Sequence, residues 1–441
     1  MSAKKWKAGL IAFTCVMVIA ASFADWRNWR GPEYDGSSQA ANLPNEFSLD
    51  SKKNIAWMTE LDGEGSSTPI VVGDRLYLTA ETMGDHGLWA VCLDRKSGDI
   101  LWRKRVGTGR KTARNNMASP SPVSDGERVC FLYGNGILAA FDLEGNSLWK
   151  RELESKYNRF TQKFGYSSSP LLYNGQLYVS IMRWLPPKSN EPDKAEKYKS
   201  WLLALDPQTG KTIWDAVRPT PALKESRDSY NTPVVGRRGI ILVGGDLVTS
   251  HDPRTGQELW RYDYRAPKPR ETMWRIISSP IVVDDLLICA YPRGGRMFAL
   301  RLPAKGQQPK MVWDKDGHMP DVCTPACEDG LLYVLDGRRK NLTCLEPESG
   351  EQVWRESMPS RTGFYASPTV ADGKIYCLDR GGDVFVLAAG RQPALLGHSS
   401  LGEKDCNATI VPVDNVLYIR SPSRLFCVSS TLPRAEGAAG R

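Results

Sequence analysis

Residues 204–214 read Ala-Leu-Asp-Pro-Gln-Thr-Gly-Lys-Thr-Ile-Trp. An aspartate that bonds its own backbone, followed by a glycine that accepts a positive φ, predicts a tight hairpin between two strands. The tryptophan four residues after the glycine is large and flat, which suits the wedge between neighbouring sheets. The pattern recurs at Asp94, Gly98 and Trp102; Asp142, Gly145 and Trp149; Asp252, Gly256 and Trp260; and Glu346, Gly350 and Trp354. Trp313 holds the same place in a looser copy, and we expect Leu396 to hold it in the copy after Trp354.

A second repeated feature is a Ser-Pro or Thr-Pro pair that opens a hydrophobic strand. Residues 408–410 (Ala-Thr-Ile) are a degenerate eighth pair, with Ile410 in the position of the proline. Counted from proline to proline and finally to Ile410, the last four intervals measure between 42 and 47 residues. A period of this length is typical of a β-propeller or a solenoid. The pairs are Thr68-Pro69, Ser121-Pro122, Ser169-Pro170, Thr232-Pro233, Ser279-Pro280, Thr324-Pro325 and Ser367-Pro368.

Each repeat divides into four short strands, A to D, separated by turns. The eighth copy ends near Val428 without a tryptophan strand, whereas residues 54–57 (Asn-Ile-Ala-Trp) form such a strand before the first copy. Pairing this N-terminal strand into the last blade would close the ring and remove two exposed edges. The sequence therefore predicts an all-β fold, an eight-bladed β-propeller of four-stranded antiparallel blades closed by the N-terminal strand, over residues 51–430.

The first 24 residues have the features of a secretory signal peptide. Lys4, Lys5 and Lys7 precede an apolar run over residues 8–21, and residues 22–24 (Ser-Phe-Ala) supply the small residues of a cleavage site before Asp25. We therefore expect an exported protein, periplasmic or extracellular, that is peripheral to a membrane at most. Lipid anchoring at Cys15 stays open. Residues 25–50 are expected to be an N-terminal extension and residues 431–441 a disordered tail.

The ten cysteines do not form a disulfide framework. Cys92, Cys344 and Cys427 stand where other repeats carry alanine, which predicts buried free thiols. Cys323 and Cys327 are either a disulfide or two free thiols. Together with His318 they match no common zinc spacing, so no metal site is expected.

The Ser-Pro strand, the segment Ala204 to Trp214 and N-terminal closure resemble the PQQ-type propeller repeat over nearly all of the mature chain. That family includes quinoprotein alcohol and glucose dehydrogenases and the assembly factor BamB. The start Asp25-Trp-Arg-Asn-Trp-Arg-Gly-Pro32 is similar to secreted PQQ-like propellers of planctomycetes. The resemblance implies the fold more strongly than the activity, since the matched motifs are structural. The adjacent-cysteine disulfide and the Cys-x-x-Cys-His haem motif of quinoprotein dehydrogenases are missing from this sequence.

A propeller sorts its loops between two faces. The D–A and B–C connections lie on one face, called here the D–A face, and the A–B and C–D turns lie on the other, called the A–B face. Basic residues outnumber acidic ones on the D–A face, which favours an anionic partner. Aromatic residues precede several strand-A anchors there, and aromatic with arginine is favoured binding chemistry. The candidate binding residues are Arg114, Tyr166, Arg227, Tyr230, Trp274, Arg275, Tyr365 and Arg380.

Two functions follow from these observations. The first is a non-catalytic, BamB-like binding or scaffolding module, a monomer with no catalytic residues and no cofactor, that engages protein, peptide or polysaccharide through its D–A face. Nucleic acid is not an expected partner of an exported protein, despite the net charge of +8. The alternative is an oxidoreductase of alcohols or sugars that binds PQQ, with calcium, near Trp274 and Arg275.

Overall fold

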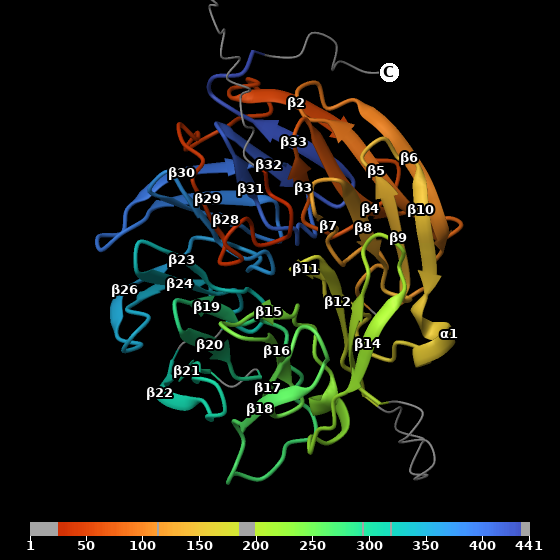
Figure 1. Ribbon diagram of the computed structural model, residues 1–441. Coiled ribbons are helices and arrows are strands. Elements are labelled where there is room, and N and C mark those ends of the chain that lie inside the picture. Colours follow the sequence, from red (N-terminus) through yellow and green to blue (C-terminus); the bar gives the residue numbers. More distant parts are fainter. Residues whose placement is uncertain (1–24, 113, 185–198, 293–294, 318–319, 434–441) are drawn as a thin grey trace, which may run out of the picture.

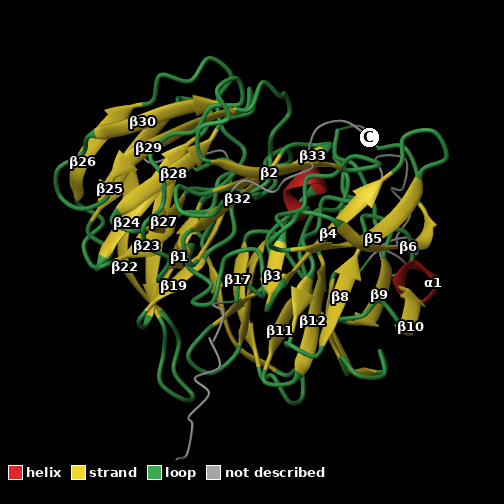
Figure 2. Ribbon diagram, turned by 90° about the horizontal axis from the view of Figure 1, so that it is seen from above, coloured by secondary structure: helices red, strands yellow, loops and turns green. Residues whose placement is uncertain are grey.

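The computed structural model describes residues 25–433 apart from 113, 185–198, 293–294 and 318–319. Eight sheets stand around a central axis, and the chain visits them in order (Figure 1). Figure 2 shows mainly strands and loops, and the helical segments of the described residues are the short α1 (Leu153–Tyr157) and the 3₁₀ turn Lys224–Arg227. The predicted eight-bladed, all-β propeller is confirmed.

The first four blades are each a meander of four antiparallel strands. Blade 1 holds β3 (Ile70–Val72), β4 (Arg75–Glu81), β5 (Gly87–Asp94) and β6 (Ile100–Thr108). Blade 2 holds β7 (Val123–Ser124), β8 (Arg128–Leu132), β9 (Ile137–Asp142) and β10 (Ser147–Glu152). Blade 3 holds β11 (Leu171–Tyr173), β12 (Gln176–Ile181), β13 (Trp201–Leu205) and β14 (Thr212–Val217). Blade 4 holds β15 (Val234–Val235), β16 (Ile240–Gly244), β17 (Leu247–His251) and β18 (Glu258–Asp263).

The second four blades repeat the meander, with additions from the N-terminal segment in the last two. Blade 5 holds β19 (Ile281–Val283), β20 (Leu286–Ala290), β21 (Arg296–Arg301) and β22 (Lys310–Asp316). Blade 6 holds β23 (Ala326–Glu328), β24 (Leu331–Asp336), β25 (Asn341–Leu345) and β26 (Gln352–Ser357). Blade 7 holds β27 (Thr369–Ala371), β28 (Lys374–Leu378), β29 (Asp383–Ala388) and β30 (Leu395–Ser400), joined by β1 (Ser37–Ser38). Blade 8 holds β31 (Val411–Val413), β32 (Val416–Arg420) and β33 (Arg424–Val428), and β2 (Ile55–Glu60) completes it.

Ring closure uses the N-terminal strand, as the sequence predicts. The strand β2 pairs antiparallel with β33, which places Trp57 opposite Cys427 (Figure 1). Side chains reinforce the junction between blades 8 and 1, because Arg95 binds Asp414 at 2.5 Å and the buried Arg420 donates to the Thr79 carbonyl at 2.7 Å. The seam therefore combines backbone pairing with buried hydrogen bonds.

Six strand-D tryptophans dock on the C–D turn of the next blade. The Trp57 indole N–H donates to the Arg95 carbonyl at 3.2 Å, and a Cβ on Gly98 would lie 2.5 Å from the Trp57 ring. Gly98 also has φ +79°, so both backbone conformation and space require glycine there. The same indole bonds recur from Trp102 to Leu143, Trp149 to Pro207, Trp214 to Pro253, Trp313 to Pro347 and Trp354 to Gly390.

The seventh copy differs from the sequence prediction by one residue. The position opposite Val386, which matches the tryptophan position of other blades, is Gly397, and Leu396 is the bulged residue before it. A Cβ on Gly397 would lie 2.2 Å from the Asn45 carbonyl oxygen. The N-terminal segment therefore packs where a tryptophan stands in other blades, and the expectation of Leu396 at that position is wrong.

The Ser/Thr-Pro anchors form a ring of hydrogen bonds around the axis. At seven of the eight junctions the backbone N–H of the anchor residue donates to the hydroxyl of the anchor in the following blade, and Thr409 stands in the eighth position. These bonds explain why the repeat carries a small hydroxyl residue immediately before the proline. The bonds run from Thr68 to Ser121, Ser121 to Ser169, Ser169 to Thr232, Thr232 to Ser279, Ser279 to Thr324, Thr324 to Ser367 and Thr409 to Thr68.

The cysteines of the described chain are buried free thiols, Cys323 and Cys327 included. Cys92, Cys344 and Cys427 lie directly opposite Trp102, Trp354 and Trp57 in register. A small residue is needed there because the indole covers it. Burial raises the pKa of the Cys344 thiol to about 12, so this thiol stays protonated and unreactive near neutral pH.

The predicted signal peptide and most of the predicted C-terminal tail lie outside the described residues. Within the described residues, no helix has the length and apolar character needed to cross a membrane.

Candidate functional site

The ring encloses a cavity of about 700 Å³ on the axis. Its wall is built from the anchor hydroxyl residues and from the D–A loops that lead into them, so the cavity belongs to the D–A face. Hydroxyl, amide and charged groups share this wall with aromatic rings. The cavity is called the channel below.

The N-terminal segment closes the channel at the A–B face. Trp26 pairs with Val71 on blade 1, the Tyr34 hydroxyl donates to the Leu172 carbonyl on blade 3, and β1 runs parallel to β27 on blade 7. The segment thus crosses the axis between distant blades. Trp29 lies on the channel wall, at the end that this segment closes.

Arg30 fixes the closed end. Its side chain is 3 % exposed and donates to the carbonyls of Pro325 at 2.6 Å and Pro368 at 3.1 Å, one residue beyond the anchors of blades 6 and 7. Burial lowers the pKa of Arg30 to about 10, so the guanidinium remains charged at neutral pH. Gly36 packs against it with φ +84°, and a Cβ there would overlap the guanidinium. The predicted N-terminal extension is therefore built into the propeller.

At the open end, two arginines stack on one phenylalanine. The guanidinium carbons of Arg114 and Arg275 lie 5.3 and 4.6 Å from the Phe164 ring centroid. The Phe164 backbone N–H donates to the Tyr230 hydroxyl at 3.1 Å. Arg114 is exposed and forms no ion pair with any described residue. This group offers an accessible positive charge beside an aromatic surface.

Two acids behind this group hold it in place. Glu225 binds Lys163 at 2.6 Å and Arg275 at 3.4 Å, while Asp228 accepts the Lys163 backbone N–H at 3.0 Å. Burial raises the pKa of Asp228 to about 7. Arg275 is therefore partly neutralised and fixed in orientation, while Arg114 remains available to a ligand.

A smaller pair of the same kind lies across the mouth. The Arg380 guanidinium carbon lies 4.7 Å from the Tyr365 ring centroid, and Arg380 binds the exposed Asp405 at 2.7 Å. Tyr365 is 41 % exposed. The loops that lead into blades 3 and 7 thus each present an aromatic ring with an arginine over it at the channel mouth.

Five of the eight predicted site residues line the channel: Arg114, Tyr230, Arg275, Tyr365 and Arg380. The other three do not. Tyr166 is buried and donates its hydroxyl to the Ser180 carbonyl, Arg227 is half-buried beside Asp228, and Trp274 lies half-buried on the loop before Arg275. All three were predicted at the channel mouth because they lie in the loops that precede strand-A anchors. Within one such loop, however, some side chains face the channel wall and others point into the protein interior.

Some wall residues were not predicted from sequence. Glu81 is 3 % exposed, lies 2.9 Å from the His86 Nδ1 through Oε1, and accepts the Met117 backbone N–H at 2.6 Å through Oε2. Glu81 and His86 thus tie the D–A loop that leads into blade 2 to blade 1. Neither residue belongs to the repeat pattern, and Trp29 comes from outside the repeats altogether, so no periodic signal pointed to them.

The channel wall is not simply basic. The wall has nearly as many acidic side chains as basic ones. The basic residues are Arg110, Lys111, Arg114, Arg275 and Arg380, and the acidic ones are Glu64, Glu81, Asp321 and Asp405.

The channel wall can be compared with the groups that PQQ and a metal ion would need. PQQ is a flat, aromatic tricarboxylate, and the stacked arginines suit such an anion. However, no three His, Cys, Asp or Glu side chains within the described residues converge in a way that could hold a metal ion.

Comparison with known proteins gives the family. A family model described as outer membrane protein assembly factor BamB matches residues 45–183, 158–322 and 309–392. The chain belongs to this family. Among curated relatives of this BamB-type propeller, the outer membrane protein assembly factor BamB of Yersinia pestis is 22 % identical over 327 residues, 70 % of this chain and 73 % of that protein.

Other relatives carry dehydrogenase names. Polyvinylalcohol dehydrogenase of Sphingopyxis sp. (strain 113P3) is 24 % identical over 395 residues, which is 80 % of this chain and 54 % of the relative. The chain spans about half the length of the polyvinylalcohol dehydrogenases that it matches. Relatives of this BamB-type propeller thus include both an assembly factor and redox enzymes.

Solved structures show the same division. A europium-containing methanol dehydrogenase superposes with a TM-score of 0.65 at 13 % identity, covering 90 % of this chain and 89 % of that one. BamB from Moraxella catarrhalis superposes with a TM-score of 0.61 at 14 % identity, covering 86 % of this chain and 99 % of that one. At these identities the likeness is one of fold.

Proposed function

We propose that this protein is an exported, non-catalytic binding propeller that receives anionic groups of a protein, peptide or polysaccharide at the open end of its channel. The observation that carries the proposal is the pair of arginines on Phe164. Arg114 is exposed without an ion-pair partner among the described residues, whereas Arg275 is fixed by Glu225. A charged group that is held on an aromatic ring and lacks a counter-ion suits an anionic ligand.

Export is supported by the predicted signal peptide and by membership in a family named for outer-membrane assembly. Binding through the D–A face is supported by the closure of the opposite face. Trp29 lies on the channel wall and Arg30 bonds across the A–B end of the axis, which favours entry of a ligand from the D–A face.

The test uses two anionic probes, oligogalacturonate and poly-L-glutamate, with neutral dextran as the control. Titration calorimetry at 50 mM NaCl is expected to show binding of at least one anion, weakened by added salt, and no binding of dextran. If neither anion binds, or if dextran binds equally well, the proposal is wrong.

The second candidate is the PQQ-dependent oxidoreductase, favoured by the dehydrogenase relatives. It is tested by titrating PQQ with calcium while following absorbance and dye-linked oxidation of ethanol, glucose and polyvinyl alcohol. Saturable binding with turnover would replace the non-catalytic proposal, whereas no turnover at micromolar PQQ supports it.

A further inference from the structure

A second cavity of about 380 Å³ lies beside the channel, between the D–A loop that leads into blade 2 and the one that leads into blade 3. It shares Arg110, Lys111 and Thr112 with the channel wall, so the two hollows are neighbours across one short stretch of chain. The second cavity is called the cleft below. It also has Arg159, Gln162 and Lys163 on its wall.

The charge of the cleft differs from that of the channel. No acidic side chain stands among the described residues of its wall. Glu154 neutralises Arg110 and Glu225 neutralises Lys163, both at 2.6 Å and both from outside the wall. Lys111 and Arg159 are exposed and form no ion pair within the described chain. Two positive charges therefore remain for a ligand.

One residue of the cleft wall has an unused acceptor atom. Gln162 is 6 % exposed, and its Nε2 donates to the Met182 carbonyl at 2.7 Å, which fixes the orientation of the amide. Its Oε1 is buried and has no hydrogen-bond partner within the described residues. An amide oxygen in this state calls for a donor such as a hydroxyl group.

The two loops are tied together at both ends of the cleft. Arg110 makes a two-bond contact with Glu154, and Glu154 in turn accepts the Phe160 backbone N–H at 2.7 Å. At the other end, the Asn115 backbone N–H donates to the Phe164 carbonyl at 3.1 Å. The Phe160 and Tyr166 rings pack against each other in a tilted arrangement, with centroids 4.8 Å apart, on the wall between these ties. The cleft is thus held in shape before a ligand arrives, which lowers the entropy cost of binding.

We infer that the cleft is a subsite for an acidic sugar: its anionic group binds Lys111 and Arg159, and a hydroxyl group donates to the Oε1 of Gln162. The shared wall at Arg110 to Thr112 lets an acidic saccharide chain continue from the cleft into the channel mouth. A peptide carries carboxylates but few hydroxyls, so the unpaired acceptor favours the saccharide. The inference rests on the proposed binding function and names its ligand class.

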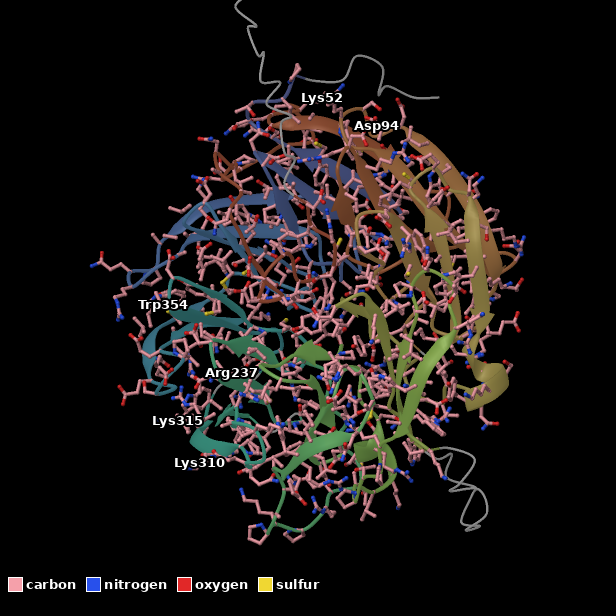
Figure 3. The ribbon with its side chains drawn as sticks, in the orientation of Figure 1. Lys52, Asp94, Arg237, Lys310, Lys315 and Trp354 are labelled. Carbon is pink, nitrogen blue, oxygen red and sulfur yellow. The ribbon has the colours of Figure 1, made fainter. Side chains whose placement is uncertain are left out.

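The experiment measures affinity of the full mature chain by titration calorimetry at 50 mM NaCl. The saccharide probes are oligogalacturonate and dextran sulfate, which separate carboxylate from sulfate as the anionic group, and poly-L-glutamate is the peptide probe. The cleft variant is K111A/R159A, the channel variant is R275A, and the control is K310A on β22 at the outer rim (Figure 3).

We expect the cleft variant to bind the better saccharide at least tenfold more weakly than the wild type, and the control to bind it unchanged. Because Lys111 and Arg159 are exposed, the melting temperature should not move, which separates lost binding from lost folding. The acidic-sugar subsite is overturned if the cleft variant binds like the wild type while R275A loses affinity, or if poly-L-glutamate binds more tightly than both saccharides. If the wild type binds none of the three anionic probes, the proposed function itself is overturned.

Discussion

The two ends of the channel are built from different kinds of sequence. At the A–B face, residues 25–43 are held by backbone hydrogen bonds to blades 1, 7 and 8 and by a Tyr34 side-chain bond to blade 3, and Arg30 is buried. At the D–A face, loops from inside the repeats carry arginines that stack on rings, and one of them has no counter-ion in the described chain. Both ends use arginine. The difference is that the Arg30 guanidinium donates to backbone carbonyls, whereas the Arg114 guanidinium has no hydrogen bond or ion pair to a described residue.

This difference separates structural cations from ligand-binding ones. A buried guanidinium that donates to main-chain carbonyls stabilises the fold and is costly to remove, because the carbonyls are then left unpaired. An exposed guanidinium on an aromatic ring adds little to stability but is free to meet an anion. The comparison predicts opposite responses to substitution at the two ends.

The largest effect is expected at the closed end. Arg30→Ala should lower the free energy of unfolding by about 3 kcal/mol, since the carbonyls of Pro325 and Pro368 lose their donors in a buried site. Urea unfolding of purified protein measures it. Arg27→Ala in the same segment is the control, because that side chain is exposed. A loss below about 1 kcal/mol for Arg30→Ala would show that this end is not held as described.

The next effect concerns the acid behind the open end. The pKa of Asp228 is raised to about 7 in the folded protein, so the folded state keeps a proton that the unfolded chain releases near pH 4. Stability should therefore fall as pH rises from about 4 to 7. Asp228→Asn should remove roughly 2 kcal/mol of this fall between pH 5 and 8, measured by urea unfolding at each pH.

The matched control for that series is Asp405→Asn, an exposed carboxylate at the same mouth. It should keep the pH dependence of the wild type. An Asp228→Asn variant whose stability changes with pH as the wild type does would contradict the assignment of this buried acid.

The smallest effect is expected at the open end. Arg114→Ala should leave the free energy of unfolding within about 0.5 kcal/mol of the wild type, because the side chain is exposed. Its affinity for an anionic probe should fall about threefold at low salt, with a smaller loss at high salt. Arg114→Lys should recover part of the affinity but not the planar stacking. Unchanged affinity for Arg114→Ala would remove this residue from the site.

The repeat explains how much of the molecule was predictable. Spacing of Ser-Pro and Asp–Gly–Trp features predicted the eight blades and the role of Trp57, because each feature makes the same contact in most copies. It misplaced Leu396, since the N-terminal segment occupies that position next to Gly397. The site was only partly predictable. Arg275 and Tyr365 could be placed from topology, whereas Trp29 and the orientation of Tyr166 depend on contacts that no repeat encodes.

We propose that a ligand enters the channel from the D–A face alone. The buried cysteines of the described chain make an introduced thiol a clean reporter, so we would place one at Thr112 on the shared wall and another at Glu33 on the exposed N-terminal segment. Iodoacetamide labelling rates of Thr112→Cys and Glu33→Cys are then compared with and without saturating oligogalacturonate. The account predicts that the ligand slows labelling at position 112 several-fold and leaves position 33 unchanged. Protection at position 33, or equal rates at both positions with and without a ligand that binds, would contradict it.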